Sequence, residues 1–327
     1  MTASGFRYIY GPVPSPRLGL SLGVDLAPFK TCTYDCIYCQ LGRTTHKTIT
    51  RQEYVPLADI LPELEQKLAD GPVPDYVTLA GSGEPTLNAR LGELLGEIKK
   101  LTSIPVAVLT NGSLLWRPEV QDELLAADLV LPSLDAGDDF LFRYVNRPHR
   151  EIGFDQMVQG LAEFTARFPR PVWLEVFLLA GVTNILSEVE KIAALARQIR
   201  PEKVQLNTVS RPGAEEFACP VSRQQIQEFA KLFDRQVEVI PAGEYDKSPA
   251  PIMNEATEAD ILALLSRRPC TVQGVAAGLG LAAGEAARRI EALAAQGVVK
   301  PVQNQGTRFY QIMRGAGGKP AADNGST

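Results

Sequence analysis

The sequence has no hydrophobic run long enough to cross a membrane as a helix, which takes about 20 apolar residues. Its longest apolar stretch, "VWLEVFLLAGV", is much shorter and contains Glu175. The opening segment, "MTASGFRYIYGPVPSP", has neither a secretory nor a transit-peptide character. We therefore expect a cytoplasmic protein with no membrane segment.

Basic charge is not in excess either. Across 327 residues the formal net charge is −5, which removes a whole-surface attraction to nucleic acid but leaves room for a local basic patch. The 45% hydrophobic and 22% charged content is ordinary for a globular protein. The length suits one large domain or two ordinary ones.

Cysteine is scarce and unevenly placed. Three of the five cysteines fall in "CTYDCIYC", residues 32–39, while Cys219 and Cys270 are isolated. In a chain of this length, that distribution excludes a disulfide framework. Three thiolates on one short loop can instead occupy three corners of an iron–sulfur cube and leave the fourth iron without a protein ligand. A structural zinc site with His46 as its fourth ligand is the alternative that the spacing leaves open.

Short β-branched or apolar runs alternate with segments whose apolar residues recur at helical spacing. This alternation predicts strands at about 21–28, 76–81, 106–112, 129–135, 172–181, 203–209 and 237–241, and helices at about 57–70, 90–102, 117–128, 154–168 and 185–200. Strands and helices in turn are typical of a parallel sheet. Six or seven such strands fit an open or partial (β/α) barrel, in which polar residues at the carboxyl ends of the strands line the site.

The pattern changes near residue 250. Three helices are expected at 257–268, 271–279 and 282–297, followed by two strands within 298–313 that are joined by a turn at Asn304 to Thr307. This order is typical of a winged helix-turn-helix domain. We therefore divide the chain into a barrel domain at 1–245, a linker at 246–256, a winged-helix domain at 257–314 and a disordered tail at 315–327.

Polar residues stand at the ends of several predicted strands. In "GSGEP", Gly81 and Gly83 allow a backbone to approach a ligand closely, and Glu84 can accept a hydrogen bond from an ammonium group. Taken alone, such a segment is equally well an ordinary turn, and each of the other residues is more often a turn residue or a helix cap. Their recurrence at successive strand ends favours a binding site. Those other residues are Thr110, Asn111, Ser133, Asp135, Glu175 and Asn207.

The cysteine loop resembles the hallmark of the radical S-adenosylmethionine (SAM) superfamily, Cys-x3-Cys-x-aromatic-Cys. Cys32, Cys36, Tyr38 and Cys39 match it, and the resemblance extends over residues 10 to 245. "GSGEP" is similar to the Gly-Gly-Glu strand end of that superfamily, with Ser82 between the glycines. The resemblance favours a cluster over zinc, and it implies an α/β fold with a partial (β/α)6-type barrel.

The same resemblance implies two cofactors, a [4Fe–4S] cluster and SAM. The metal ligands would be Cys32, Cys36 and Cys39. Tyr38 would lie against adenine, Glu84 would hold the methionine amino group, and the "SLD" segment would lie near the ribose and methionine. The implied SAM-binding residues are Tyr38, Gly81, Gly83, Glu84, Asn111, Ser133, Asp135, Glu175 and Asn207.

Within the superfamily, the segments "YGPVPSPRLGLSLGVDL" and "NRPH" resemble proteins related to the wybutosine-synthesis enzymes of tRNA. Cys219 and Cys270 cannot complete a second cluster, so one cluster is expected. The implied function is reductive cleavage of SAM to a 5′-deoxyadenosyl radical that abstracts hydrogen from a substrate, with an RNA base as the leading substrate. A flavodoxin- or ferredoxin-like protein would donate the electron. Arg17, Arg147 and His149 are candidates for binding a carboxylate or phosphate.

An iron–sulfur-dependent, redox-sensing DNA-binding regulator is the alternative, because a cluster and a winged helix also suit such a protein. The expected recognition helix begins with Ala282, Ala283, Gly284 and Glu285, which offer little for reading bases. Residues 255 to 314 contain seven Lys or Arg against five Asp or Glu, a weak basic excess. We expect this domain to contact an RNA or protein substrate, or to pack against the barrel.

Overall fold

The computed structural model describes residues 6–240 and 256–313. The expected linker, except for its last residue, and the expected tail lie outside these residues. The first described part contains the strands β1 (Ile9–Ser15), β2 (Gly19–Val24), β3 (Thr31–Cys32), β4 (His46–Lys47), β5 (Tyr76–Leu79), β6 (Val106–Thr110), β7 (Leu129–Pro132), β8 (Trp173–Ala180), β9 (Lys203–Thr208), β10 (Cys219–Pro220) and β11 (Gln236–Val239). Its helices are α1 (Leu57–Asp70), the short 3₁₀ helix η1 (Pro85–Leu87), α2 (Leu91–Leu101), α3 (Pro118–Leu124), α4 (Asp139–Val145), α5 (Phe154–Arg167), α6 (Leu186–Ile199) and α7 (Arg223–Ala230).

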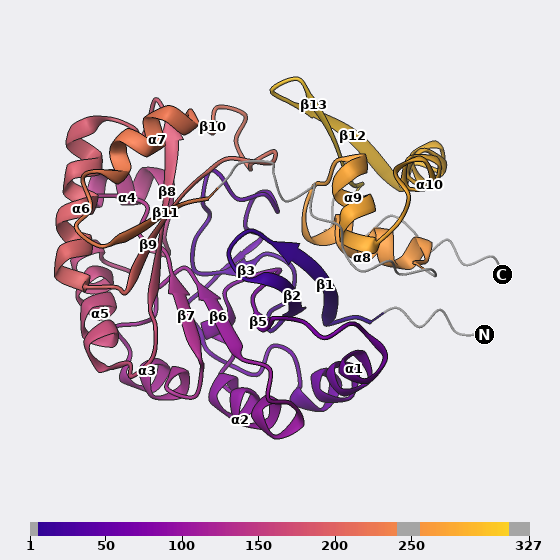
Figure 1. Cartoon of the computed structure of the whole chain (residues 1–327). Coiled ribbons are helices and arrows are strands. Elements are labelled where there is room, and N and C mark those ends of the chain that lie inside the picture. The colour runs from indigo at the N-terminus through magenta and orange to yellow at the C-terminus, as the bar shows by residue number, and fades with distance from the viewer. Residues whose placement is uncertain (1–5, 241–255, 314–327) are drawn as a thin grey trace.

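Two sheets carry this part of the chain. The first has the strand order β1-β2-β5-β6-β7 and the second the order β10-β8-β9-β11. Pairing is parallel throughout except at β1 and β10, each of which is antiparallel to its neighbour. The two sheets meet at β7 and β8 through isolated bridges at Val130–Val172 and Ser133–Glu175. Within the described residues neither sheet closes on itself, and the helices lie around the outside of the strands (Figure 1).

The apolar pattern explains why these elements form where they do. All four residues of β7 are buried, as expected for a strand covered on both faces. In α6 the buried residues Val189, Ile192, Ala193, Ala196 and Ile199 recur at helical spacing and form one face against the core. The predicted strands and helices of this part are therefore confirmed, with boundaries shifted by a few residues.

Some elements were not expected from the sequence. The strand β1 reads "IYGPVPS", with two prolines and a glycine that disfavour a strand. It is tolerated because β1 is an edge strand whose register with β2 shifts between Tyr10 and Val13, and Gly11 there has a φ of +93°. The short elements α4, α7, β3, β4 and β10 were missed for lack of a periodic signal.

The second described part contains α8 (Glu258–Arg267), α9 (Val272–Leu279), α10 (Ala283–Ala295) and the antiparallel hairpin of β12 (Val299–Asn304) and β13 (Thr307–Ile312). We call residues 256–313 the C-terminal unit. A capping box between Thr257 and Asp260 begins α8. The unit buries its own apolar cluster, into which Val13 of β1 also packs. The C-terminal unit therefore lies against β1, beside the sheet (Figure 1).

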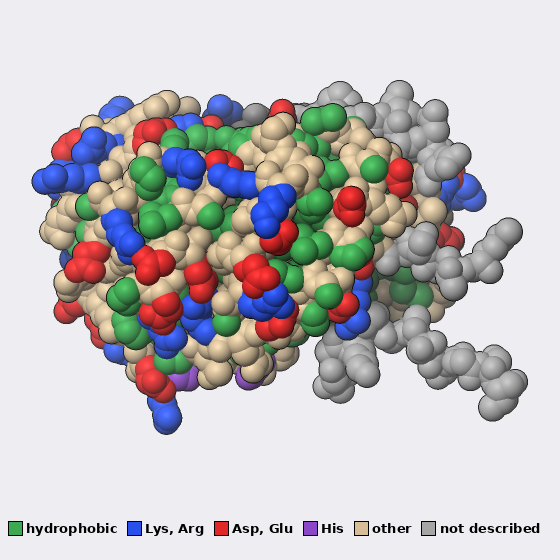
Figure 2. All heavy atoms as spheres, turned by 90° about the horizontal axis from the view of Figure 1, so that it is seen from below, with side chains coloured by type: hydrophobic (Ala, Val, Ile, Leu, Met, Phe, Trp, Pro, Cys, Tyr) green, Lys and Arg blue, Asp and Glu red, His purple; other side chains and the backbone are tan. Residues whose placement is uncertain are grey.

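The surface reflects the balance of charge in the sequence. On the face that carries α1 to α3, Lys and Arg side chains are interspersed with Asp and Glu side chains (Figure 2). Among the described helices, none has both the length and the apolar character that crossing a membrane requires.

Candidate functional site

A cavity of about 420 Å³ lies at the carboxyl ends of β5 to β9, beside the cysteine loop. Of the residues predicted to bind the cluster or SAM, all but Asp135 line it. They are Cys32, Cys36, Tyr38, Cys39, Gly81, Gly83, Glu84, Asn111, Ser133, Glu175 and Asn207. Residues from Cys32 to Asn207 thus meet at one place.

The three cysteines of the loop are each near a hydrogen-bond donor. Lys30 Nζ lies 3.1 Å from Cys39 Sγ, Asn111 Nδ2 lies 3.5 Å from Cys32 Sγ, and Asn146 Nδ2 lies 3.5 Å from Cys36 Sγ. Donors to sulfur tune an iron–sulfur cluster and favour thiolate over thiol. Each of the three sulfurs therefore has a nearby donor, which fits a cluster on three thiolates.

The buried cation Lys30 was not predicted from the sequence. Its side chain is only 3% exposed. Burial acts to lower its pKa, but the sulfurs of Cys39 and Cys32 outweigh this effect and the pKa of Lys30 is raised. A charged ammonium group beside Cys39 offsets part of the negative charge that three thiolates bring into the protein.

The zinc alternative finds little support in the placement of His46. This residue is exposed on β4, and its ring lies edge-on to Tyr54, with 6.5 Å between ring centroids. In the described parts of the chain, no three His, Cys, Asp or Glu side chains are grouped closely enough to hold one metal ion.

Glu84 caps η1 with a carboxylate that is 2% exposed. Its Oε1 accepts hydrogen bonds from the Thr86 N–H (3.0 Å) and from the hydroxyls of Thr86 (2.7 Å) and Thr110 (2.6 Å). Its Oε2 accepts one from the Asn111 N–H (2.8 Å). Burial raises the pKa of Glu84, although the bonds from Thr110, Asn111 and Thr86 act to lower it. Oε2, with a single donor, retains a lone pair for a further donor in the cavity.

At both glycines of the loop at residues 81–84, close contacts leave no room for a side chain. A Cβ on Gly81, whose φ is +132°, would lie 1.8 Å from Asp25 Oδ1. A Cβ on Gly83 would lie 2.0 Å from the carbonyl oxygen of Thr31, next to the first cysteine. Residues 81–84, which we call the glycine loop, therefore pack directly on the segment that enters the cysteine loop.

Tyr38 lines the site and is supported by Asp135, which does not line the cavity. The Tyr38 ring stacks on Phe177, with 4.0 Å between centroids, and its hydroxyl donates to Asp135 Oδ2. Asp135 also accepts from Asn146 Nδ2 (2.7 Å) and from the Phe177 N–H (3.2 Å). Burial raises the pKa of Asp135 to about 6, against the lowering effect of the bonds from Tyr38 and Asn146. Asp135 thus contacts Tyr38 and does not line the cavity, and its role as a SAM-binding residue stays a prediction.

Glu175 on β8 lies 2.8 Å from both Arg17 Nη1 and Asn207 Nδ2. Of the three predicted anion-binding residues, only Arg17 lines the cavity. Arg147 pairs with Glu215 at 2.6 Å, and His149 receives the backbone N–H of Glu151 on Nδ1 at 3.4 Å. These two residues belong to the packing around the cysteine loop.

A sequence profile of the radical SAM superfamily matches residues 26–205, more than half of the chain. The chain belongs to the radical SAM superfamily. A [4Fe–4S] cluster and SAM are the cofactors of this superfamily, so the two predicted cofactors are confirmed at that level. The α/β radical SAM fold is confirmed as well. A radical SAM methyltransferase from Sphaerobacter thermophilus aligns with a TM-score of 0.52 over 67% of this chain and 65% of that chain, at 20% identity.

Curated relatives cover more of the chain. UPF0026 protein MJ1312 of Methanocaldococcus jannaschii is 34% identical over 80% of this chain and 82% of its own length. A Brachyspira hyodysenteriae protein named GTPase Obg is 39% identical over 94% of this chain. The chain spans only 45% of the length of that second relative.

Some residues at or near the cavity were not predicted from the sequence. Leu264, Arg267 and Arg268 of the C-terminal unit line the cavity, although every predicted ligand precedes the linker. Asp25 stands just after β2 but inside the strand predicted at about 21–28, so it was not recognised as a strand-end residue. No sequence pattern indicated the three residues of α8 and its end, because only the packing of the C-terminal unit on β1 brings them to the cavity.

Proposed function

We propose that this chain is a radical SAM enzyme with one [4Fe–4S] cluster on Cys32, Cys36 and Cys39. The observation that carries the proposal is the joint lining of one cavity by these cysteines and by Glu84 with its spare lone pair. When bound, the cluster and SAM supply a 5′-deoxyadenosyl radical that abstracts a hydrogen atom from the substrate.

The chain's own residues bind and orient SAM in this proposal. Glu84 Oε2 accepts a hydrogen bond from the methionine ammonium group, and the glycine loop lets the ligand approach the backbone. Tyr38, held by Asp135 and Phe177, presents its ring to adenine. Asn111, Ser133, Glu175 and Asn207 supply polar groups along the strand ends.

Glu84→Gln should weaken SAM binding about tenfold or more. The glutamine oxygen is best placed at Oε1, where three donors meet, which leaves its NH₂ group at Oε2 facing the Asn111 N–H and the ligand ammonium. Anaerobic equilibrium dialysis with labelled SAM measures the change. Glu93→Gln, an exposed carboxylate on α2, is the matched control. If the two variants bound SAM with equal affinity and both kept the cluster absorbance, Glu84 would be a cap of η1 and not a SAM-binding residue.

We further propose that the two sheets form a partial (β/α)6-type barrel and that the C-terminal unit is a winged helix-turn-helix domain. The bridges between β7 and β8 support the former, and the order α8-α9-α10-β12-β13 supports the latter. The domains would span 1–245 and 257–314. Because an iron–sulfur cluster on free cysteines suits a reducing compartment, we place the enzyme in the cytoplasm with a flavodoxin- or ferredoxin-like electron donor.

The substrate that we propose is an RNA base, and the support is the resemblance of "YGPVPSPRLGLSLGVDL" and "NRPH" to the wybutosine-related group. The regulator alternative is not favoured. Its recognition helix would be α10, where Arg288 and Arg289 both pair with Glu285 within the helix. Nor does the relative named GTPase Obg suggest GTP hydrolysis here, because the phosphate-loop pattern GxxxxGK[S/T] does not occur in this sequence.

The proposed reaction predicts that the anaerobically reconstituted protein, reduced with dithionite, converts SAM to 5′-deoxyadenosine and methionine. Chromatography of the quenched reaction measures both products, and protein without iron is the control. A reconstituted protein that holds its cluster and binds SAM but forms no 5′-deoxyadenosine would contradict the proposal.

The same assay tests the substrate class. Adding total RNA from an anaerobic host extract should raise the rate of 5′-deoxyadenosine formation above its basal value, and nuclease treatment of that RNA should abolish the increase. If the rise survived nuclease treatment and disappeared after protease treatment, the substrate would be a peptide rather than an RNA base.

A further inference from the structure

The C-terminal unit reaches the SAM site through a buried ion pair. Arg267, the last residue of α8, places Nε 2.8 Å from Oδ2 of Asp25, which follows β2. The two side chains are 10% and 7% exposed, and 242 positions of sequence separate them. Such a contact is unlike an exposed ion pair, because a buried carboxylate left without its partner is strongly unfavourable.

Asp25 continues this contact into the glycine loop. Its second oxygen, Oδ1, accepts the backbone N–H of Ser82 at 2.6 Å. The same oxygen occupies the space that a side chain at Gly81 would fill. One carboxylate therefore joins Arg267 on one side to the loop that ends in Glu84 on the other. Burial raises the pKa of Asp25, and both Arg267 and the bond from Ser82 oppose that rise.

Arg267 is itself held from several directions. Nη2 donates to the carbonyl oxygen of Arg7 and Nη1 to that of Ala263, each at 3.0 Å. The guanidinium lies over the ring of Tyr10, 4.6 Å from its centroid.

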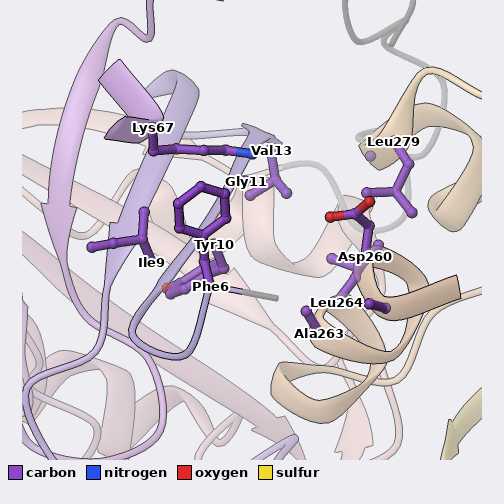
Figure 3. Close-up of a pocket in the computed structure, with 12 residues that line it drawn as sticks. Phe6, Ile9, Tyr10, Gly11, Val13, Lys67, Asp260, Ala263, Leu264 and Leu279 are labelled. Atoms are coloured by element: carbon purple, nitrogen blue, oxygen red, sulfur yellow. The ribbon is translucent and has the colours of Figure 1, made fainter. Parts of the chain in front are cut away.

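The contact between β1 and the C-terminal unit surrounds a small cavity (Figure 3). Across this cavity, Phe6, Ile9, Tyr10 and Val13 face Asp260, Ala263, Leu264 and Leu279. The position of Arg267 thus depends on how α8 packs against β1.

We propose that Arg267 is a positioning residue for SAM binding, which acts through Asp25 to hold the glycine loop in its binding shape. The proposal rests on the function proposed above. It makes packing of the C-terminal unit against β1 and binding of SAM interdependent, although the unit supplies no cluster ligand. Because the two equilibria are linked, the free energy by which SAM stabilises the packing of the unit equals the free energy by which that packing strengthens SAM binding.

The experiment compares Arg267→Gln, Asp25→Asn and the double variant with the wild-type holoenzyme, by anaerobic dialysis against labelled SAM. Each single change should weaken SAM binding about tenfold, because each breaks the same contact. The double variant should be no weaker than the weaker single variant, as expected for residues that act in series. Arg267→Lys, which keeps the charge, should restore part of the affinity. Arg288→Gln removes an exposed arginine of α10 and is the control with unchanged affinity.

Hydrogen exchange provides a second readout that does not depend on measuring affinity. Adding SAM to the wild-type holoenzyme should slow amide exchange in peptides from α8, and this slowing should be absent in Arg267→Gln. Wild-type affinity in Arg267→Gln, or a fall in melting temperature with no change in SAM affinity, would overturn the proposal. If the wild-type protein itself did not bind SAM, the proposed function would fail instead, so the two failures are distinguishable.

Discussion

Replacing any one of Cys32, Cys36 or Cys39 with Ala should abolish the iron–sulfur cluster. Each thiolate binds a different iron of a [4Fe–4S] cluster, so two remaining cysteines cannot hold the cluster against loss of iron. Wild-type protein should contain about four iron and four sulfide per chain after anaerobic reconstitution, and each variant less than about one. Iron and sulfide analysis, with the absorbance of the cluster, measures the effect.

The other two cysteines provide matched controls. Cys219 lies on β10 and does not line the cavity, while Cys270 is buried in the apolar cluster of the C-terminal unit. Cys219→Ser and Cys270→Ala should keep the full iron content. Loss of the cluster on either control change would reveal a ligand outside the cysteine loop and would contradict the single-loop assignment.

The fold was predictable wherever the signal was local and periodic. Helix α1 occupies the predicted residues, and the strands β5, β6, β7, β8 and β9 begin within one residue of their predicted starts. These segments alternate between buried apolar strands and amphipathic helices, so their own residues specify them. By contrast, β1 contains two prolines, pairs as an edge strand with β2 and packs Val13 into the C-terminal unit. Its stability comes from tertiary contacts that no local pattern reveals.

The convergence of the strand-end residues on one cavity was predictable for a related reason. Parallel strands bring their carboxyl ends to one edge, so polar residues that follow successive strands converge without any further information. Glu84, Glu175 and Asn207 meet in one cavity in this way. Which of the polar residues faces the cavity was not predictable: Asp135 and Ser133 are two positions apart, yet Asp135 turns behind Tyr38.

The contributions of Lys30 and Arg267 could not be found from the sequence. Lys30 has a φ of +56° and reaches Cys39 only because the cysteine loop folds back over it. Arg267 meets Asp25 through the packing of two separately patterned parts of the chain. Such contacts depend on the relative placement of elements, which composition and periodicity leave undetermined.

Gly83→Ala should weaken SAM binding by up to about a hundredfold, because a shift of about 1 Å in a positioned site can cost that much in function. The added Cβ would lie 2.0 Å from the Thr31 carbonyl oxygen and 3.1 Å from the Ala27 Cβ, so the glycine loop or the entry to the cysteine loop must move. The Thr31 carbonyl also accepts the Glu84 N–H at 3.2 Å, and that bond holds Glu84 near the cysteines. Dialysis against labelled SAM measures the affinity, and iron analysis shows which of the two loops has moved.

Gly96→Ala is the matched control for this change. Gly96 lies within α2, and a Cβ there would meet nothing within 4 Å. The substitution should leave SAM affinity unchanged and stabilise the protein by about 0.5–1 kcal/mol, because alanine loses less conformational entropy in a helix than glycine. Normal SAM binding by Gly83→Ala, beside a normal Gly96→Ala, would place the SAM site away from the glycine loop. If Gly83→Ala kept about four iron per chain but lost SAM affinity, the glycine loop rather than the cysteine loop would have moved to make room for the added methyl group.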